Sequence, residues 1–308
     1  MISVIICSIN PQLLAAVEQN INETIGVPFE IIATDNRNSS VGISEVYNRG
    51  AAQAKYDVLC FMHEDVIMQT PNWGHIVLKL LQPQTSIGLV GVAGSYFKTL
   101  SPSGWGNATG YTDCMNIIQG FKNKGAEFNR LEIKNPFGKE KVEVAALDGV
   151  WLCTTKDIAR RTKFDQQNFS GFHCYDLDFS LTVGRHYKVV VTYEVLLTHL
   201  SEGSYTRAWM TETLKLHQKW KSSLPVITAH IDDEKRAYLE KQTFRIFLSL
   251  LIKLNLPLSL AKNLLWQKTY ISKLGIVLWT NLNFHLYKFR KKLPAYPEYH
   301  PKAYQPGE

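Results

Sequence analysis

The stretch YDVLCFMHEDV, residues 56–66, runs from a nearly unbroken apolar segment straight into three ionisable side chains. Its apolar part is typical of a strand that is buried on both faces of a sheet. His63, Glu64 and Asp65 follow in a row, at the point where that strand should end. Burying such groups is costly unless a partner compensates them, so the stretch predicts a central strand whose carboxyl end holds something.

The segments around this stretch alternate between strand and helix patterns. Alternation of this kind predicts an α/β domain with a mostly parallel sheet. Ligands bind beyond the carboxyl ends of the strands in such sheets, and the polar endings SIN, TDN and HED all fall there. The predicted strands are 3–9, 29–36, 56–66, 87–96, 141–155 and a last pair at 188–200. The predicted helices are 12–25, 42–54, 72–82, 156–162, the end of 169–187 and most of the chain from 207. Residues 99–145 are rich in Gly, Asn and aromatic residues and are expected to be irregular.

The net charge of +7 lies entirely in the last quarter of the chain. Residues 230–308 contain 13 Lys/Arg and 6 Asp/Glu, whereas residues 1–229 contain 21 of each. Apolar, aromatic and basic residues mix over 240–292, with a break at Pro257, and this composition suits helices that lie on an anionic membrane surface. A helical subdomain that packs on the rest of the chain, or on a second copy in a homodimer, explains it equally well. No nucleic-acid-binding motif accompanies the charge, so nucleic acid is not expected as a partner.

The five cysteines are scattered without a CxxC spacing, which argues against a disulfide framework and for a reducing compartment. The N-terminal residues lack the basic region of a signal peptide, and no window of about 18 apolar residues predicts a membrane-spanning helix. We therefore expect a cytoplasmic protein, with a peripheral place at the inner face of the plasma membrane as the variant that the basic region allows.

The row of three ionisable residues has the chemistry of a cation site. Mg²⁺ and Mn²⁺ prefer oxygen ligands, and Mn²⁺ also accepts imidazole. Asp65 is the expected main ligand, with His63 beside it, and the ion would lie between them and a diphosphate. A surface loop with solvated charges is the alternative explanation.

The segment FHCYDLDFS places Asp176 and Asp178 two residues apart. Close carboxylates raise each other's pKa, so one of them can serve as a general base. Acidic residues that favour a helix N-terminus are the alternative. His199 ends an apolar strand, where a lone histidine is more often a packing or capping residue. Asp148 and Gly149 read, on composition, as a tight turn.

Taken together and in order, these segments resemble the family 2 nucleotide-sugar glycosyltransferases of the GT-A type. The resemblance is to a bacterial branch in which H-x-D replaces the usual D-x-D metal motif and a DG…FD…F…FH.YD.D block follows. The matching pieces are residues 33–66 and 146–180, with THL closing the set, and the resemblance extends over roughly residues 1–205. It implies a GT-A (Rossmann-like) catalytic domain at 1–206, and it leaves 207–308 as a basic helical C-terminal region.

The resemblance implies a metal-dependent, inverting transfer of a sugar from a nucleotide diphosphate to a hydroxyl group. Mn²⁺ or Mg²⁺ is the implied cofactor, and a glycan or lipid-linked saccharide in surface polysaccharide synthesis is the implied acceptor. A nucleotidyltransferase would want a Gly-rich basic loop after the first strand, but residues 7–14, CSINPQLL, hold neither Gly nor a basic residue. A non-catalytic sugar- or nucleotide-binding module, which keeps the fold without the chemistry, stays open.

Carried over residue by residue, the resemblance makes Asp65 the second Asp of the metal motif and His199 a third metal ligand. His63 stands where the family usually has the first Asp, so it is expected at the metal, at the metal's water shell or at the ribose. Asp176 corresponds to the general base of the family's catalytic pair, and Tyr175 replaces the acid that usually precedes it.

The resemblance also implies contacts with the donor. Asp35 is expected to hydrogen-bond the base, and its single carboxylate favours uracil, whose N3–H it can accept. The other residues expected at the donor are Asn10 near the ribose, Asn48 and Arg49 near the diphosphate, Glu64 within the metal motif, Asp148 at a sugar and Asp178 beside the general base.

Overall fold

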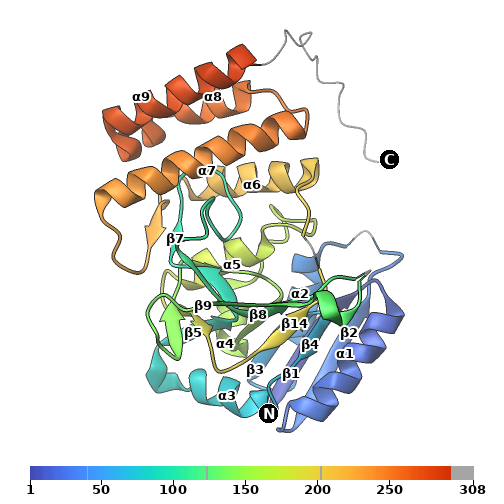
Figure 1. Ribbon diagram of the computed structural model, residues 1–308. Coiled ribbons are helices and arrows are strands. Elements are labelled where there is room, and N and C mark those ends of the chain that lie inside the picture. The colour runs from blue at the N-terminus through green and yellow to red at the C-terminus, as the bar shows by residue number, and fades with distance from the viewer. Residues whose placement is uncertain (40, 123, 202, 293–308) are drawn as a thin grey trace.

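The predicted central strand is β3, Val58–His63, and it lies inside a seven-stranded sheet (Figure 1). The computed structural model describes residues 1–292 apart from 40, 123 and 202. From one edge to the other, the strands are β10 (Lys141–Glu143), β13 (Lys188–Thr192), β5 (Ile87–Gly91), β12 (Trp151–Thr155), β3, β1 (Ile2–Ser8) and β2 (Phe29–Asp35). Only β10 and β12 run against the direction of the other five, which confirms a mostly parallel α/β sheet.

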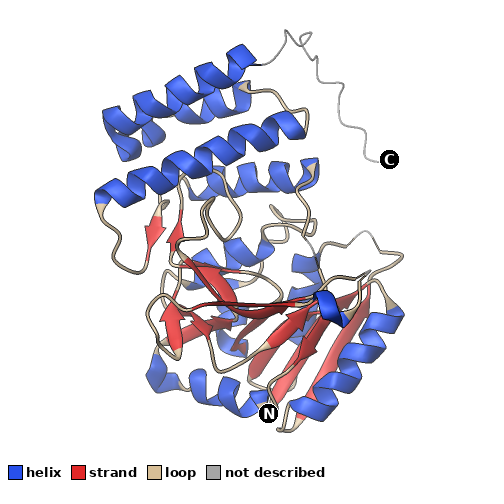
Figure 2. Cartoon of the chain, in the orientation of Figure 1, coloured by secondary structure: helices blue, strands red, loops and turns tan. Residues whose placement is uncertain are grey.

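Helices cover both faces of this sheet (Figure 2). On one face, Val4 and Met62 pack in a core with two helices, α1 (Pro11–Thr24) and α3 (Trp73–Leu80). On the other face, Ile5 and Phe61 pack with α2 (Ile43–Gln53), α4 (Lys156–Thr162) and α5 (Tyr175–Val183). Successive side chains of a strand point to opposite faces, so the unbroken apolar runs of β1 and β3 fill both cores.

A second sheet begins where predicted single strands divide. The segments 56–66 and 87–96 each contribute one strand to each sheet, so their prediction as continuous strands was wrong. The segment 188–200 contains the two strands predicted for it, and these also lie in different sheets. Apolarity and alternation are local signals, and they do not show which sheet a segment joins. The second sheet has the order β11 (Ala146–Leu147), β6 (Ala93–Ser95), β8 (Asp113–Gln119), β14 (Leu197–His199) and β4 (Val66–Met68), with β9 (Arg130–Lys134) paired to β8.

Residues 99–145 are more regular than predicted, because they contain β8, β9 and β10. β8 lies in the second sheet and pairs with β6, β9 and β14. The pairing with β14 joins Gln119 to His199, across a large separation in sequence, so no local pattern announces it. Short 3₁₀ turns lie at Pro83–Thr85 and Ala126–Phe128.

The C-terminal region is helical, as predicted (Figure 1). Its elements are α6 (Arg207–Trp220), β15 (Val226–Ile227), which pairs with β7 (Phe97–Lys98), α7 (Asp233–Lys253), α8 (Ser259–Leu265) and α9 (Lys268–Lys292). Pro257 separates α7 from α8, and α9 kinks at Gly275, whose φ of 70° is readily adopted by glycine. Among the described residues, no helix combines the length and apolarity needed to cross a membrane. The division into two domains at residue 206 stays a prediction.

A buried loop fastens these helices to the rest of the protein. The Glu240 carboxylate of α7 accepts hydrogen bonds from the backbone N–H groups of Leu100 and Ser101, at 2.6 and 2.9 Å. The Tyr270 hydroxyl of α9 donates to the Leu100 carbonyl at 3.0 Å. All four residues are buried, so these contacts tie α7 and α9 to the segment after β7.

The same loop buries a lysine completely. Lys98 Nζ lies 2.9 Å from the Ser103 carbonyl, 2.7 Å from the Ser103 hydroxyl and 2.9 Å from His217 Nε2 on α6. Burial lowers the pKa of Lys98 to about 7, because the charged form loses its hydration. Its three contacts match the donor capacity of the amino group, which makes this a closed polar network under α6.

We expect Glu240→Ala to destabilise the protein by about 3 kcal/mol, because it leaves two buried N–H groups without an acceptor. Glu234→Ala is the matched control, since it removes the same side chain from an exposed position of the same helix. Urea unfolding followed by circular dichroism measures the difference. Equal losses of stability in the two variants would contradict the role given to Glu240.

Candidate active site

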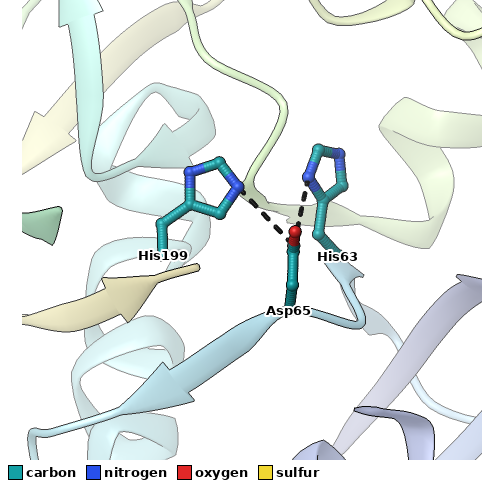
Figure 3. A group of neighbouring side chains, drawn as sticks. All are labelled: His63, Asp65 and His199. Atoms are coloured by element: carbon teal, nitrogen blue, oxygen red, sulfur yellow. Dashed lines mark ion pairs between the residues drawn. The ribbon is translucent and has the colours of Figure 1, made fainter. Parts of the chain in front are cut away.

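Three side chains from distant parts of the sequence converge beyond the end of β3. His63 is the last residue of β3, Asp65 lies in the turn to β4, and His199 is the last residue of β14. β14 pairs with β4 so that His199 stands opposite Val66, which carries its ring to Asp65. Figure 3 shows both imidazoles turned toward the Asp65 carboxylate, at 3.9 Å from His63 Nδ1 and 3.5 Å from His199 Nε2. The structure thus brings together the three residues predicted as metal ligands.

The chemistry of this cluster fits a divalent cation. The three ligand atoms, two nitrogens and one oxygen, lie within 4.8 Å of one another, and this donor set suits a divalent metal ion. His199 Nε2 is buried and finds no hydrogen-bond partner in the part of the chain that the structure describes. An unpaired buried nitrogen is costly, and a bound cation would satisfy it.

The protonation states of the cluster also suit a cation. Burial alone would raise the pKa of Asp65, but its two histidine neighbours and Lys122 outweigh burial and hold this pKa well below its usual range. Burial, followed by the electrostatic effect of the neighbouring His199, lowers the pKa of His63 to about 4. Near neutral pH the cluster therefore presents a carboxylate and a neutral imidazole, which are the forms that bind metals.

Lys122 is a neighbour that sequence reasoning missed. Its Nζ lies 2.9 Å from Asp65 Oδ2, on the carboxylate oxygen that does not face the histidines. The segment after β8 carries this lysine, and β8 reaches the site through its pairing with His199. No sequence signal could have found Lys122, because both the strand and its pairing were absent from the prediction.

The predicted general base lies beside this cluster, at the start of α5. Asp176 Oδ2 accepts a hydrogen bond of 2.9 Å from the Gly149 N–H. Burial, followed by the negative charge of Asp148, raises the pKa of Asp176 to about 7. A carboxylate with a pKa near the working pH can take up and release a proton during a reaction.

Tyr175 connects the base to the cluster. Its hydroxyl lies 2.7 Å from His63 Nε2 and 3.1 Å from the Gly149 carbonyl oxygen. Consecutive residues of α5 thus hold both backbone polar groups of Gly149: Asp176 accepts from its N–H, and the Tyr175 hydroxyl donates to its carbonyl. The tight turn predicted at Asp148 and Gly149 is present, with the Val150 N–H donating to Asp148 Oδ1 at 2.9 Å, and its contacts with Tyr175 and Asp176 place it next to the cluster. The predicted sugar contact of Asp148 stays a prediction.

Asp35 shares the carboxyl edge of the sheet with the cluster. Asp35 pairs in register with Ser8 of β1, and Cys7 pairs with His63. Asp35 therefore lies two strands from His63, about 10 Å across the sheet. Its carboxylate is exposed and hydrogen-bonded by the Arg37 guanidinium, which lowers the pKa of Asp35 to about 2.

The side chains of Glu64 and Asn10 are engaged within the protein. Glu64 Oε2 accepts from the Ser8 hydroxyl at 2.6 Å and from the N–H groups of Ile9 and Asn10 at 3.2 and 3.0 Å. Asn10 Oδ1 accepts the two N–H groups that begin α1, as a helix cap does. Glu64 thus stabilises the turn after β1. The contacts of Glu64 and Asn10 with the sugar-nucleotide donor stay predictions.

Asn48 and Arg49, predicted at the diphosphate, also have partners in the protein. Asn48 donates to the Phe164 carbonyl at 2.9 Å and to Gln166 Oε1 at 2.8 Å, and it accepts from the Phe164 N–H at 2.9 Å. Arg49 is exposed and pairs with Glu45, one turn earlier in α2. The Asn48 side chain thus clips α2 to the segment after α4.

Asp178 points away from Asp176 and toward α6. Its Oδ1 lies 2.6 Å from Lys219 Nζ and 2.7 Å from Trp220 Nε1, and the residue is almost completely buried. The structure therefore brings only one of the two close acids to the site. Asp178 joins α5 to the C-terminal helices instead.

Comparison with known proteins assigns the class. Residues 3–221 match the model of the glycosyltransferase like family, and the chain belongs to that family. The predicted resemblance to family 2 glycosyltransferases is thereby confirmed, and glycosyltransferase is the class of enzyme that the family defines. No curated protein matches the chain.

Solved structures resemble the chain more distantly. They include GalNAc-T7 with UDP, GalNAc and Mn²⁺, at 11% identity and a TM-score of 0.49, over 83% of this chain and 54% of that one. TarS of S. aureus aligns at 10% identity and a TM-score of 0.48, over 93% of this chain and 53% of that one. A197 from STIV aligns at 12% identity and a TM-score of 0.37, over 65% of this chain and 86% of that one. The chain thus spans about half the length of GalNAc-T7 and of TarS. Because these TM-scores lie below 0.5, the class assignment rests on the family match.

We expect Asp65→Asn to weaken Mn²⁺ binding at least tenfold, because the cluster loses its only charged ligand atom. Isothermal titration calorimetry of the wild-type protein and the variant measures the two dissociation constants. Asp57→Asn, which changes an exposed carboxylate near the opposite end of β3, is the matched control and should bind as the wild type does. Unchanged binding by Asp65→Asn would place the metal elsewhere.

Proposed function

We propose that this protein is a metal-dependent, inverting glycosyltransferase that moves a sugar from a nucleotide diphosphate donor to a hydroxyl group. One observation carries the proposal: the cluster of His63, Asp65 and His199 lies at the carboxyl edge of the sheet and is hydrogen-bonded, through Tyr175 and Gly149, to Asp176. A glycosyl transfer from a diphosphate needs these two things close together, a cation for the leaving group and a base for the attacking group.

His63, Asp65 and His199 would hold Mn²⁺ or Mg²⁺, and the ion would neutralise the negative charge that develops on the departing diphosphate. Asp176 accepts the proton of the acceptor hydroxyl, and the oxygen then attacks the anomeric carbon from the face opposite the diphosphate. Attack from that face inverts the configuration. General base catalysis of this kind contributes about 10² to 10⁴ in rate.

Asp35 would read the base of the donor. A carboxylate can accept the N3–H of uracil, which makes UDP the proposed nucleotide. The separation of about 10 Å between Asp35 and His63 leaves room for a ribose between base and diphosphate. Asp148, whose charge acts on both His63 and Asp176, is proposed to contact a sugar hydroxyl between the metal and the base.

The proposed acceptor is a glycan or a lipid-linked saccharide in surface polysaccharide synthesis. The basic C-terminal region supports the lipid-linked form, since residues 241–292 contain ten Lys/Arg and no Asp or Glu. Such a region is complementary to the inner face of an anionic plasma membrane, on the cytoplasmic side where we place the protein.

One face of α9 has the composition for that contact. Ile276, Val277, Phe284 and Tyr287 are each more than half exposed. Lys288 lies over the Phe284 ring at 4.5 Å, and the next turn repeats the arrangement with a lysine over Tyr287. Exposed apolar and aromatic side chains with lysines at their margin suit the boundary between headgroups and acyl chains.

We expect Asp176→Asn to reduce transfer by about 10²- to 10⁴-fold, because an amide cannot accept the hydroxyl proton. UDP binding, measured by the thermal shift with Mn²⁺, should persist. In the wild-type protein, kcat/KM should fall as pH falls through about 7, since protonation removes the base, and the variant should lack this limb. Asp157→Asn, an exposed change in α4, is the control. Wild-type turnover by Asp176→Asn would refute the assignment of the base.

Thermal-shift and turnover measurements also separate the transferase from a non-catalytic binding module and from a nucleotidyltransferase. A thermal shift that depends on Mn²⁺ and is largest with UDP, compared with GDP and CMP, supports the transferase. Turnover of the donor then excludes a non-catalytic binding module, whereas nucleotide binding without turnover or hydrolysis would favour that module. Release of pyrophosphate from a nucleoside triphosphate would favour a nucleotidyltransferase.

The full chain should float with phosphatidylserine-containing vesicles at low salt. Lys288→Glu combined with Lys291→Glu should reduce the bound fraction at least tenfold, because each lysine near such a surface contributes about 1 kcal/mol. Lys139→Glu combined with Lys215→Glu makes the same change in net charge on other surfaces and is the control. A wild-type protein that fails to float and forms a dimer in light scattering would replace the membrane by a second copy of the chain.

A further inference from the structure

The Tyr175 hydroxyl occupies a place that its neighbours define closely. It lies 2.7 Å from His63 Nε2 and 3.1 Å from the Gly149 carbonyl oxygen, and the residue is buried. Its ring packs edge-on against Tyr47, with ring centroids 5.6 Å apart. A Cβ at position 149 would stand 2.1 Å from the Tyr175 oxygen, so only glycine leaves room for this approach.

Counting hydrogens assigns the donors. A tyrosine hydroxyl has one hydrogen, the Gly149 carbonyl can only accept, and His63 Nε2 can donate or accept according to its tautomer, so both contacts are hydrogen bonds only when the hydroxyl donates to Gly149. The hydroxyl oxygen then accepts from His63, which requires a hydrogen on Nε2. A neutral imidazole has a hydrogen on one nitrogen only, so Nδ1 is left with a free lone pair.

Asp65 is the group that could impose the opposite tautomer. Its Oδ1 lies 3.9 Å from His63 Nδ1, which is beyond hydrogen-bonding distance. The contact with Tyr175 is more than 1 Å shorter. Asp65 therefore does not hold a proton on Nδ1, and the hydrogen bond with Tyr175 determines the tautomer of His63.

We propose that Tyr175 is a positioning residue that holds His63 as the Nε2–H tautomer and turns the Nδ1 lone pair toward Asp65 and His199. A histidine ligand needs such an outer partner, because the hydrogen bond on one nitrogen fixes the ring and frees the other nitrogen for the metal. The tautomer follows from the hydrogen bonds alone, and its use for a cation rests on the proposed function.

The arrangement gives Tyr175 a task that the usual acid at this position could not perform in the same way. A carboxylate also accepts from Nε2–H, but it cannot donate to the Gly149 carbonyl. The tyrosine does both, and Asp176 holds the N–H of the same glycine. Tyr175 thus orients His63 and also fixes the backbone of Gly149, whose N–H donates to Asp176.

The tautomer is measured by nitrogen NMR of ¹⁵N-histidine-labelled protein at pH 7.5 without metal. The His63 signals are those that His63→Gln removes. In the wild type, the correlations should show the proton on Nε2. Tyr175→Phe keeps the ring and removes the hydroxyl, so it should give a mixture of tautomers or the Nδ1–H form. Tyr193→Phe, which removes a hydroxyl that donates to the Lys134 carbonyl instead, should leave the wild-type pattern.

Mn²⁺ binding, followed by electron paramagnetic resonance, is the second measurement. Tyr175→Phe should bind about 10- to 100-fold more weakly than the wild type, whereas Tyr193→Phe should bind equally well. A proton on Nδ1 in the wild type would overturn the proposal even if Tyr175→Phe failed to fold. Unchanged tautomer and affinity in a folded Tyr175→Phe would overturn it too. An Nε2–H wild type that binds no Mn²⁺ would refute the metal-dependent function and support the tautomer.

Discussion

The Asp65 carboxylate is buried between two histidines and a lysine, at the point where one strand leaves the main sheet for the second. Its backbone carbonyl accepts the Leu200 N–H at 2.9 Å, which ties the turn to the end of β14. A buried carboxylate without partners would be strongly destabilising, so the two sheets must meet here with basic groups on both sides. The division of the strand and the convergence of His63, Asp65 and His199 are consequences of the same constraint.

From this point a chain of short contacts leads to Asp176, the proposed base. His63 is hydrogen-bonded to the Tyr175 hydroxyl, which is hydrogen-bonded to the Gly149 carbonyl, and the Gly149 N–H donates to Asp176. Each link is a hydrogen bond between buried or half-buried groups, where low dielectric strengthens such bonds. The leaving-group side and the acceptor side of the proposed reaction are therefore held in one rigid frame rather than on separate loops.

The C-terminal helices belong to the same architecture. Asp178, next but one to the base, is bound by Lys219 and Trp220 of α6, and Glu240 of α7 holds the buried loop after β7. Displacing α6 would leave Asp178 buried without its cation, which couples the place of the helices to that of α5. The face of α9 that we assign to the membrane lies on this attached layer, so membrane contact would orient the catalytic part as well.

The sequence by itself determined the α/β alternation, because apolar runs and the polar groups that end them are local patterns, and the ordered motifs at 33–66 and 146–180 indicated the family. The resemblance to family 2 glycosyltransferases grouped His199 with His63 and Asp65, since a lone histidine at the end of an apolar strand reads by itself as a packing or capping residue. Only the tertiary structure decided that the strand divides after His63, that Lys122 and the Tyr175 hydroxyl reach the cluster, and which predicted donor residues spend their hydrogen bonds inside the protein. Those outcomes depend on pairings between residues tens of positions apart, and a pattern read along the chain contains no signal for them.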